Sequence, residues 1–293
     1  QFPEPVIEKA IEPKTKADQD KLEEALQRLM QEDPSFRSRI DTETGQNIIS
    51  GMGELHLEIM VDRLQREFKV DCKAGTPRVA YRETIKEAVD SETKFEKLLD
   101  GKEQFASCII SLEPLKAGGG FEFVNKMSAN DLPANFAEAV EQGIQGAMSN
   151  GVLAGFAMID LKASLVAAEY LEELSTEIAF SIAGMNAFRA GVQKAKPTLL
   201  EPSMKIEVVT PASFTGEVIG DLNARHGRIR GMEEQGGVQV ISAETPLAEM
   251  FGYSTRLRSL TQGRATFTMH FSHYSTVTEA TRKALTGESA CSG

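Results

Sequence analysis

The sequence lacks tryptophan and has only three cysteines among its 293 residues, Cys72, Cys108 and Cys291. The cysteines are odd in number, lie far apart and form no CxxC pair, which excludes a disulfide framework and favours a reducing compartment, the cytoplasm. No apolar run reaches the roughly 18 residues that a membrane-spanning helix needs, and no signal peptide opens the chain. We therefore expect a cytoplasmic protein without a membrane partner.

Two further absences concern chemistry and length. The phosphate-binding pattern GxxxxGK[ST] does not occur, so we expect no P-loop and no enzymatic activity in this chain by itself. The chain starts at Gln1 instead of methionine, which suggests part of a longer protein. What is present is typical of folded proteins, with 41% hydrophobic and 26% charged residues in a length that suits two or three domains.

The net charge of −11 argues against nucleic acid as a partner, but the charge is unevenly distributed. Residues 1–77 and 78–199 each carry −5, whereas residues 200–293 carry only −1. This last part holds an arginine cluster that consists of Arg225, Arg228, Arg230, Arg256, Arg258 and Arg264. Arginine can bind two phosphate oxygens through its planar fork, so the cluster is a candidate nucleic-acid contact. The alternative is a set of surface arginines paired with Glu233, Glu234 and Glu249.

The first 77 residues predict the order βαββαβ. Strands are expected at 2–11, 36–40, 46–50 and 68–72, with a hairpin turn at 41–45. One helix should follow the cap Thr15 and end at Asp33-Pro34. Leu55, Ile59, Leu64 and Phe68 mark a second helix. This order indicates a ferredoxin-like two-layer sandwich.

Residues 203–271 repeat this order. Strands are expected at 205–210, 228–232, 238–243 and 264–271, with a tight turn at Gly236-Gly237. Thr210-Pro211 and Thr245-Pro246 each predict a helix start, with threonine as the cap and proline in the first position.

The segment between the repeats differs. Strands are expected at 79–89, 105–112, 121–125 and 158–166, and helices at 135–148 and 175–193. We therefore predict an α+β protein with domains at 1–77, 78–199 and 200–278, in which two ferredoxin-like sandwiches flank the middle domain. Residues 279–293 are polar and should form a disordered tail.

Glycine-rich stretches are weak candidate sites. Gly51-Met52-Gly53 precedes a helix and could hold an anion on free backbone N–H groups, although a plain helix start explains it as well. Gly118-Gly119-Gly120 is typical of a flexible turn and less so of a phosphate cradle.

Histidines give equally weak metal signals. Glu54, His56 and Glu58 are ligand types, but residues two apart on a helix face different directions. His270 and His273 should point to opposite faces of a strand. We expect no metal site from either set.

Several longer strings follow one another in a fixed order. They are Phe2-Pro-Glu-Pro-Val6, Ile49-Ser-Gly-Met-Gly-Glu-Leu-His-Leu-Glu58, Met148-Ser-Asn-Gly-Val-Leu-Ala-Gly155, Gly216-Glu-Val-Ile-Gly-Asp-Leu-Asn223, Leu257-Arg-Ser-Leu-Thr-Gln-Gly-Arg264 and Phe271-Ser-His-Tyr274. In these strings the chain resembles the carboxyl-terminal part of bacterial translation elongation factor G, over residues 2–274. The resemblance covers the third, fourth and fifth domains of that family.

The resemblance implies ferredoxin-like third and fifth domains and a ribosomal-protein-S5-like fourth domain. It implies a full-length GTPase that uses GTP and Mg²⁺, with the GTPase domain on the same polypeptide and no cofactor in the present part. The implied function is translocation of tRNA and mRNA during protein synthesis. The implied partners are the ribosome (rRNA and ribosomal proteins) and the tRNA–mRNA pair at the decoding site, and the implied state is a monomer.

The resemblance also assigns three groups of site residues. Candidate rRNA contacts in the fifth domain are Arg225, Arg228, Arg230, Arg258 and Arg264. Candidates for coupling to the GTPase domain are Gly51, Gly53, Glu54 and His56. The candidate decoding-site tip of the fourth domain is Ser107 with Glu169, Tyr170, Leu171 and Glu172.

The tip departs from the family pattern. Ser107 and Leu171 stand where the family commonly has histidine, and Glu169, Glu172 and Glu173 place negative charge where RNA phosphates would lie. Two explanations stay open: neutral drift in a working translocase, or a divergent paralogue that acts in ribosome recycling or ribosome protection. The alternative from another class is a metal enzyme built on the Glu54, His56 and Glu58 group.

Overall fold

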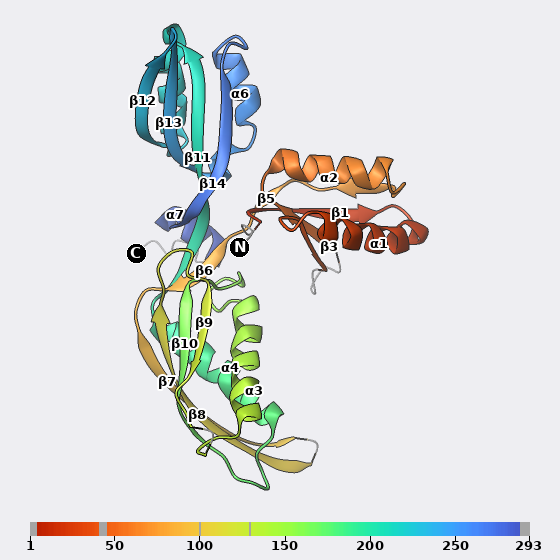
Figure 1. Ribbon diagram of the computed structural model, residues 1–293, viewed down its shortest axis with the longest axis vertical. Helices are drawn as coiled ribbons and strands as arrows, with labels where there is room; N and C mark the ends of the chain where they lie inside the picture. The colour runs from red at the N-terminus through yellow and green to blue at the C-terminus, as the bar shows by residue number, and fades with distance from the viewer. Residues whose placement is uncertain (1–4, 41–45, 100, 129, 288–293) are drawn as a thin grey trace. The chain divides into compact units, whose positions relative to one another are not determined.

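The computed structural model describes residues 5–40, 46–99, 101–128 and 130–287 (Figure 1). These residues form two compact units, one from the described parts of 5–80 and 201–273 and the other from those of 81–200 and 274–287. The predicted hairpin turn at 41–45 lies outside the described residues. Within the described ranges, no helix combines the length and the apolar character needed to cross a membrane.

The first sandwich has the predicted order βαββαβ. Its elements are β1 (Ile7–Pro13), α1 (Lys16–Glu32), β2 (Arg37–Ile40), β3 (Asn47–Gly51), α2 (Glu54–Arg66) and β4 (Cys72–Ala74), followed by β5 (Arg78–Val79), which pairs with β1. The antiparallel sheet has the order β2-β3-β1-β4. Thr15 caps α1 as predicted, because its side chain accepts a hydrogen bond from the N–H of Asp18.

The second predicted helix is confirmed as α2, but the residues that marked it do not share one face. Leu57, Met60 and Leu64 are buried against the sheet, whereas Leu55 and Ile59 are exposed. At 3.6 residues per turn, Leu57 and Leu64 lie about two turns apart on one face, whereas Leu55 and Leu64 lie about two and a half turns apart on opposite faces. The last strand is also shorter than predicted, since residues 68–71 form the turn into β4.

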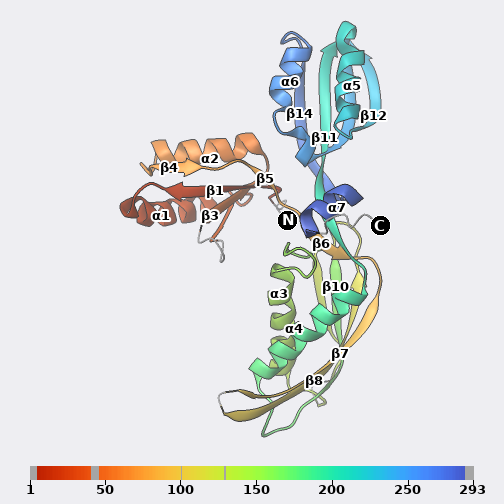
Figure 2. The same cartoon turned by 180° about the vertical axis from the view of Figure 1, so that it is seen from behind.

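The repeated sandwich has the same topology. Its elements are β11 (Pro197–Pro211), η1 (Ala212–Phe214), α5 (Thr215–Ala224), β12 (Arg228–Gln235), β13 (Val238–Pro246), η2 (Leu247–Met250), α6 (Tyr253–Leu260) and β14 (Thr266–Thr276). The sheet order is β12-β13-β11-β14, and α5 and α6 share one core with it (Figure 2). The predicted turn at Gly236 and Gly237 is confirmed, and both residues have positive φ.

Both predicted Thr-Pro helix starts are wrong. Strands β11 and β13 run through Pro211 and Pro246, and a 3₁₀ turn without a side-chain cap follows each. Thr245 lies within β13 and is not a cap; its hydroxyl donates to the carbonyl oxygen of Arg225 at 3.1 Å. Thr210 is fully buried within its strand.

The other unit is built on a different sheet. Its elements are β6 (Arg82–Ile85), β7 (Val89–Leu99), β8 (Lys102–Pro114), β9 (Phe121–Asn125), α3 (Ala134–Ser149), β10 (Leu161–Glu169), α4 (Glu177–Lys194) and α7 (Glu279–Thr286). The sheet order is β7-β8-β10-β9, with β9 and β10 parallel. Strand β6 pairs with the first residues of β11. The predicted α+β class, with two such sandwiches flanking a middle domain, is therefore confirmed.

Helices α3 and α4 cross at two glycines and close the core of this unit. A Cβ atom placed on Gly143 would lie 2.0 Å from the carbonyl oxygen of Ser181, and one on Gly184 would lie 2.8 Å from that of Val140. The two backbones therefore touch directly, which residues larger than glycine would prevent.

The predicted disordered tail is wrong for residues 279–286, which form α7. Thr278 caps this helix by accepting a hydrogen bond from the N–H of Thr281, and Arg282 pairs with Glu279 one turn away. Val277, just before the helix, donates its N–H to the carbonyl oxygen of Leu199. Residues 288–293 lie outside the described part.

Candidate ribosome-binding surfaces

Arg225 is a structural residue of the repeated sandwich. It follows α5, and its Nε lies 2.9 Å from Asp221 Oδ2. Its Nη1 donates to the carbonyl oxygen of Glu249, and its guanidinium lies 5.2 Å from the centre of the Tyr253 ring. Only 20% of the side chain is exposed, so the guanidinium has little freedom to bind a phosphate. Arg225 is therefore a weaker candidate for an rRNA contact than the exposed arginines of the cluster, and that role stays a prediction.

The pseudo-symmetric repeat brings two of the clustered arginines to one carboxylate. Asp221 receives Arg225 on one oxygen and Arg256 on the other, at 3.1 Å, so it joins α5 to α6. Arg230 pairs with Glu244, a partner that the sequence did not suggest. Of the predicted acid partners, Glu249 pairs with His226 at 3.4 Å.

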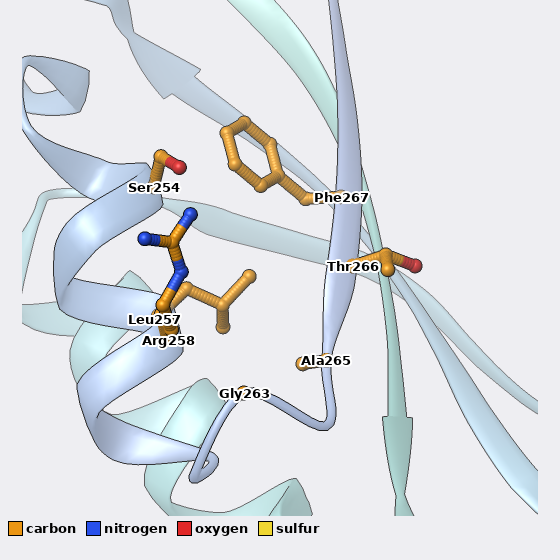
Figure 3. A pocket seen from close by; sticks show the side chains of 7 residues that line it. All are labelled: Ser254, Leu257, Arg258, Gly263, Ala265, Thr266 and Phe267. Atoms are coloured by element: carbon orange, nitrogen blue, oxygen red, sulfur yellow. The ribbon is translucent and has the colours of Figure 1, made fainter.

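Three arginines of the cluster have exposed side chains that could bind a phosphate. Arg228, Arg258 and Arg264 are exposed, and none of them has an ion pair within the described ranges. Arg264 lies 6.0 Å from the centre of the Phe214 ring. Arg258 extends from α6 toward β14 in a surface pocket of about 250 Å³, beside Leu257, Ala265 and Phe267 (Figure 3). The geometry therefore favours these three as candidate phosphate ligands.

The different roles of Arg225 and Arg228 can be tested by stability. We expect Arg225→Ala to lower the free energy of unfolding by about 1–3 kcal/mol, because it removes hydrogen bonds to a carboxylate and a carbonyl. Arg228→Ala should change it by less than about 0.5 kcal/mol, since that side chain is exposed. Scanning calorimetry of the two variants measures the difference. Equal stability of both would show that Arg225 has no structural role.

The predicted tip residues come together at one end of the other unit. Ser107 on β8 pairs directly with Glu169 at the end of β10, and with Lys94 on β7. Tyr170 follows and packs against the core, with its ring centre 5.8 Å from that of Phe136. Ser107 lies within strand β8, which starts three residues earlier than the predicted strand at 105–112.

Leu171 occupies an exposed turn that is firmly attached to the sheet. Its N–H donates to Ser175 Oγ at 2.9 Å, and that hydroxyl donates to the carbonyl oxygen of Phe105 at 2.7 Å. The N–H of Phe105 in turn donates to the carbonyl oxygen of Leu174. Nearly half of the Leu171 side chain is exposed, and Glu172 is exposed beside it. The tip therefore presents an apolar side chain next to carboxylates.

Of the predicted coupling residues, His56 is held in place by two hydrogen bonds. Its Nδ1 accepts from the N–H of Met52 at 3.1 Å, which leaves Nε2 as the donor to Asp33 Oδ2 at 3.0 Å. Gly51 has no room for a side chain, because a Cβ atom would lie 2.7 Å from Leu57 and 2.9 Å from His56. Gly53 directly precedes α2, and Glu54 is its first residue.

The carboxylate that His56 contacts is stabilised in its charged form. Burial acts to raise the pKa of Asp33, but hydrogen bonds from the hydroxyl and N–H of Ser35, together with His56, outweigh burial and lower it. Both ring nitrogens of His56 are thus engaged within the fold. In the described part of the chain, no group of three or more His, Cys, Asp or Glu residues is arranged to hold a metal ion.

Two buried carboxylates that sequence reasoning missed organise glycine-containing loops. Asp160 accepts the N–H groups of Gly118 and Gly120 at 3.1 and 2.9 Å, so the glycine turn is held in place from within. Glu83 likewise accepts hydrogen bonds from the N–H groups of Val152 and Ala154, in the loop that follows α3. Neither residue lies in a recognisable pattern, and no sequence signal would have identified them.

Comparisons with known proteins agree with the fold. Models described as Elongation Factor G domain III, Elongation factor G domain IV and Elongation factor G C-terminus match residues 2–76, 77–196 and 198–285. A crystal structure of a protein from Thermus thermophilus is 38% identical, with a TM-score of 0.74. The match covers 100% of the present chain and 44% of the Thermus thermophilus protein, so the present chain spans under half the length of that protein. The chain therefore belongs to the elongation factor G family, of which it contains domain III, domain IV and the C-terminal domain.

Proposed function

We propose that the chain is the ribosome-binding carboxyl-terminal part of a GTP-dependent elongation factor that promotes tRNA–mRNA translocation in the cytoplasm. The observation that supports this most is the unbroken order of three elongation factor G domains over residues 2–285. The partners would be rRNA, ribosomal proteins and the tRNA–mRNA pair, with the factor acting as a monomer.

GTP and Mg²⁺ do not fit the residues of this chain. The sequence has no GxxxxGK[ST] loop to hold a triphosphate, and the described residues include no set of carboxylates arranged around a cation. In the proposal, both belong to a GTPase domain of the same polypeptide. The contribution of this chain is binding and occupation of space.

Two surfaces would share this work. Arg228, Arg258 and Arg264 are exposed cations that suit an RNA backbone. The turn at Leu171 is tied to β8 through Ser175, which suits a tip that must keep its shape against a load. No reacting group is needed for either task.

The proposal is tested on the complete factor with GTP and pretranslocation ribosomes, by toeprinting of the mRNA. We expect a forward shift of three nucleotides. Ribosome binding without any shift would refute translocation as the task of this factor.

The tip supports a second candidate, a divergent factor for ribosome recycling or ribosome protection. The supporting observation is the exposed Leu171 beside Glu169 and Glu172, since like charges weaken contact with phosphates. Splitting of post-termination ribosomes by the factor, without mRNA movement, would favour this candidate. Growth of a deletion strain on tetracycline would test ribosome protection.

We expect Leu171→His to change ribosome affinity by less than about twofold, because one exposed side chain is a small part of a large contact. Its effect should appear in the rate of tRNA movement. Ile59→His, at an exposed apolar residue of the first sandwich, is the control and should leave both quantities unchanged. A large loss of affinity with Leu171→His alone would contradict the assignment of this turn to the tip.

A further inference from the structure

Glu83 is a fully buried carboxylate whose ligands are backbone N–H groups. Its Oε2 accepts from Val152 and Leu153, both at 2.8 Å, and its Oε1 accepts from Ala154 at 2.8 Å and Phe156 at 3.0 Å. Four converging N–H groups form an anion-binding nest, of the kind that proteins use for phosphates. Here the anion is a side chain of the same unit.

The loop that forms the nest is shaped around this carboxylate. Gly151 has a φ of +60°, and a Cβ atom there would lie 2.3 Å from the carbonyl oxygen of Phe156 and 2.6 Å from Glu83 Oε1. The N–H groups of Gly151 and Met158 both donate to the carbonyl oxygen of Met148, at the end of α3. Without an anion, the four N–H groups would converge on one another with no acceptor, which is unfavourable in a partly buried site.

Glu83 also joins this loop to two strands. It lies in β6, opposite Leu199 of β11. Its backbone N–H donates to the carbonyl oxygen of Ala157 at 3.0 Å, and its carbonyl oxygen accepts from Ile159 at 2.9 Å. Strand β10 begins at Leu161, immediately beyond this attachment, and ends at Glu169. At about 3.3 Å per residue, β10 spans roughly 30 Å from this attachment to the tip. A shift at its first residue would therefore displace the tip.

We propose that Glu83 is a positioning residue for the tip, which it controls by holding the base of β10 through the nest at residues 152–156. The part that concerns movement of tRNA rests on the proposed function. The part that concerns the nest is independent of it, because it depends only on the folded chain.

The nest is tested by hydrogen exchange on the 293-residue chain carrying Glu83→Gln. A carboxamide has one acceptor oxygen and presents an NH₂ group to the remaining N–H donors. We expect the amides of Val152, Leu153, Ala154 and Phe156 to exchange roughly 10- to 100-fold faster, whereas the amide of Met158, which bonds to backbone, changes little. Glu92→Gln, on exposed β7, removes the same charge and should change none of them. Unchanged exchange at the four amides would overturn the proposal.

Positioning is tested in the complete factor by separating ribosome binding from mRNA movement. We expect Glu83→Gln to leave ribosome affinity unchanged and to slow movement at least about tenfold, with Glu92→Gln normal in both. If the nest amides lose protection and movement stays at the wild-type rate, Glu83 does not position the tip. If the wild-type factor moves no mRNA, the proposed function fails while the exchange result still decides the nest.

A second variant covers the case in which Glu83→Gln does not fold. Glu83→Asp keeps the charge but shortens the side chain by one methylene, so it should retain part of the protection at the four amides and part of the rate of movement. Full wild-type protection and rate in Glu83→Asp would show that contact with the four N–H groups is not required.

Discussion

Gly143→Ala is expected to lower the free energy of unfolding of its unit by at least about 2 kcal/mol. The added Cβ would lie 2.0 Å from the carbonyl oxygen of Ser181, which no real contact allows. A backbone atom cannot rotate out of the way as a side chain can, so α3 and α4 must separate. Separation would loosen the core that Val140, Phe180 and Phe188 form between the helices and the sheet.

Another glycine of α3 provides a control, at which the same substitution should raise stability instead of lowering it. Gly146 lies three residues further along α3, is exposed, and would place a Cβ atom in open space. Gly146→Ala should raise stability by about 0.5–1 kcal/mol, because alanine loses less conformational freedom in a helix than glycine. Scanning calorimetry compares the two substitutions. If both stabilise to the same degree, the helices do not meet at Gly143.

Simultaneous replacement of Arg228, Arg258 and Arg264 by alanine should weaken ribosome binding by on the order of 10- to 100-fold at low salt. Each arginine that contacts a phosphate displaces condensed cations, so the slope of log affinity against log salt should decrease by about 1 for each residue removed. Binding of the complete factor at several salt concentrations measures both effects.

Two comparisons make this result specific. Arg28→Ala combined with Arg66→Ala removes exposed cations of the first sandwich, each of which pairs with a carboxylate one turn away, and should change the slope little. The unfolding temperature of the triple variant should change little, since these three side chains are exposed and form no ion pair within the described part. A triple variant with an unchanged slope would exclude this arginine set as an RNA contact.

Much of the fold could be predicted from local patterns. The alternation of strand and helix periods, with the cap at Thr15 and the turn at Gly236, was sufficient for both sandwiches. Predictions failed where a local signal had two structural meanings. Thr-Pro pairs suit a helix start, but at Thr210 and Thr245 they extend strands, because the threonines are buried in the sandwich core.

The candidate sites were less predictable than the fold. Six clustered arginines look alike in sequence, yet Arg225, Arg230 and Arg256 bind carboxylates of their own sandwich and three stay available. Asp221 and Glu244, which select between these roles, come close only when α5, α6 and the sheet have assembled. The tip is a contrasting case, since Ser107 and Glu169 were predicted as one site and are direct partners in the sheet.

The sequence by itself determined the order of elements, the α+β class and the family, because hydrophobic periodicity and long motifs depend only on residues that are close together in the chain. Only the tertiary structure decided which arginines pair with carboxylates of their own sandwich and which stay exposed without an ion pair in the described part. Glu83 shows the reason most clearly: its four ligands lie about 70 residues away and are backbone N–H groups, which every residue except proline carries. Backbone N–H groups give no side-chain signal, so only the folded chain shows that these four belong to Glu83.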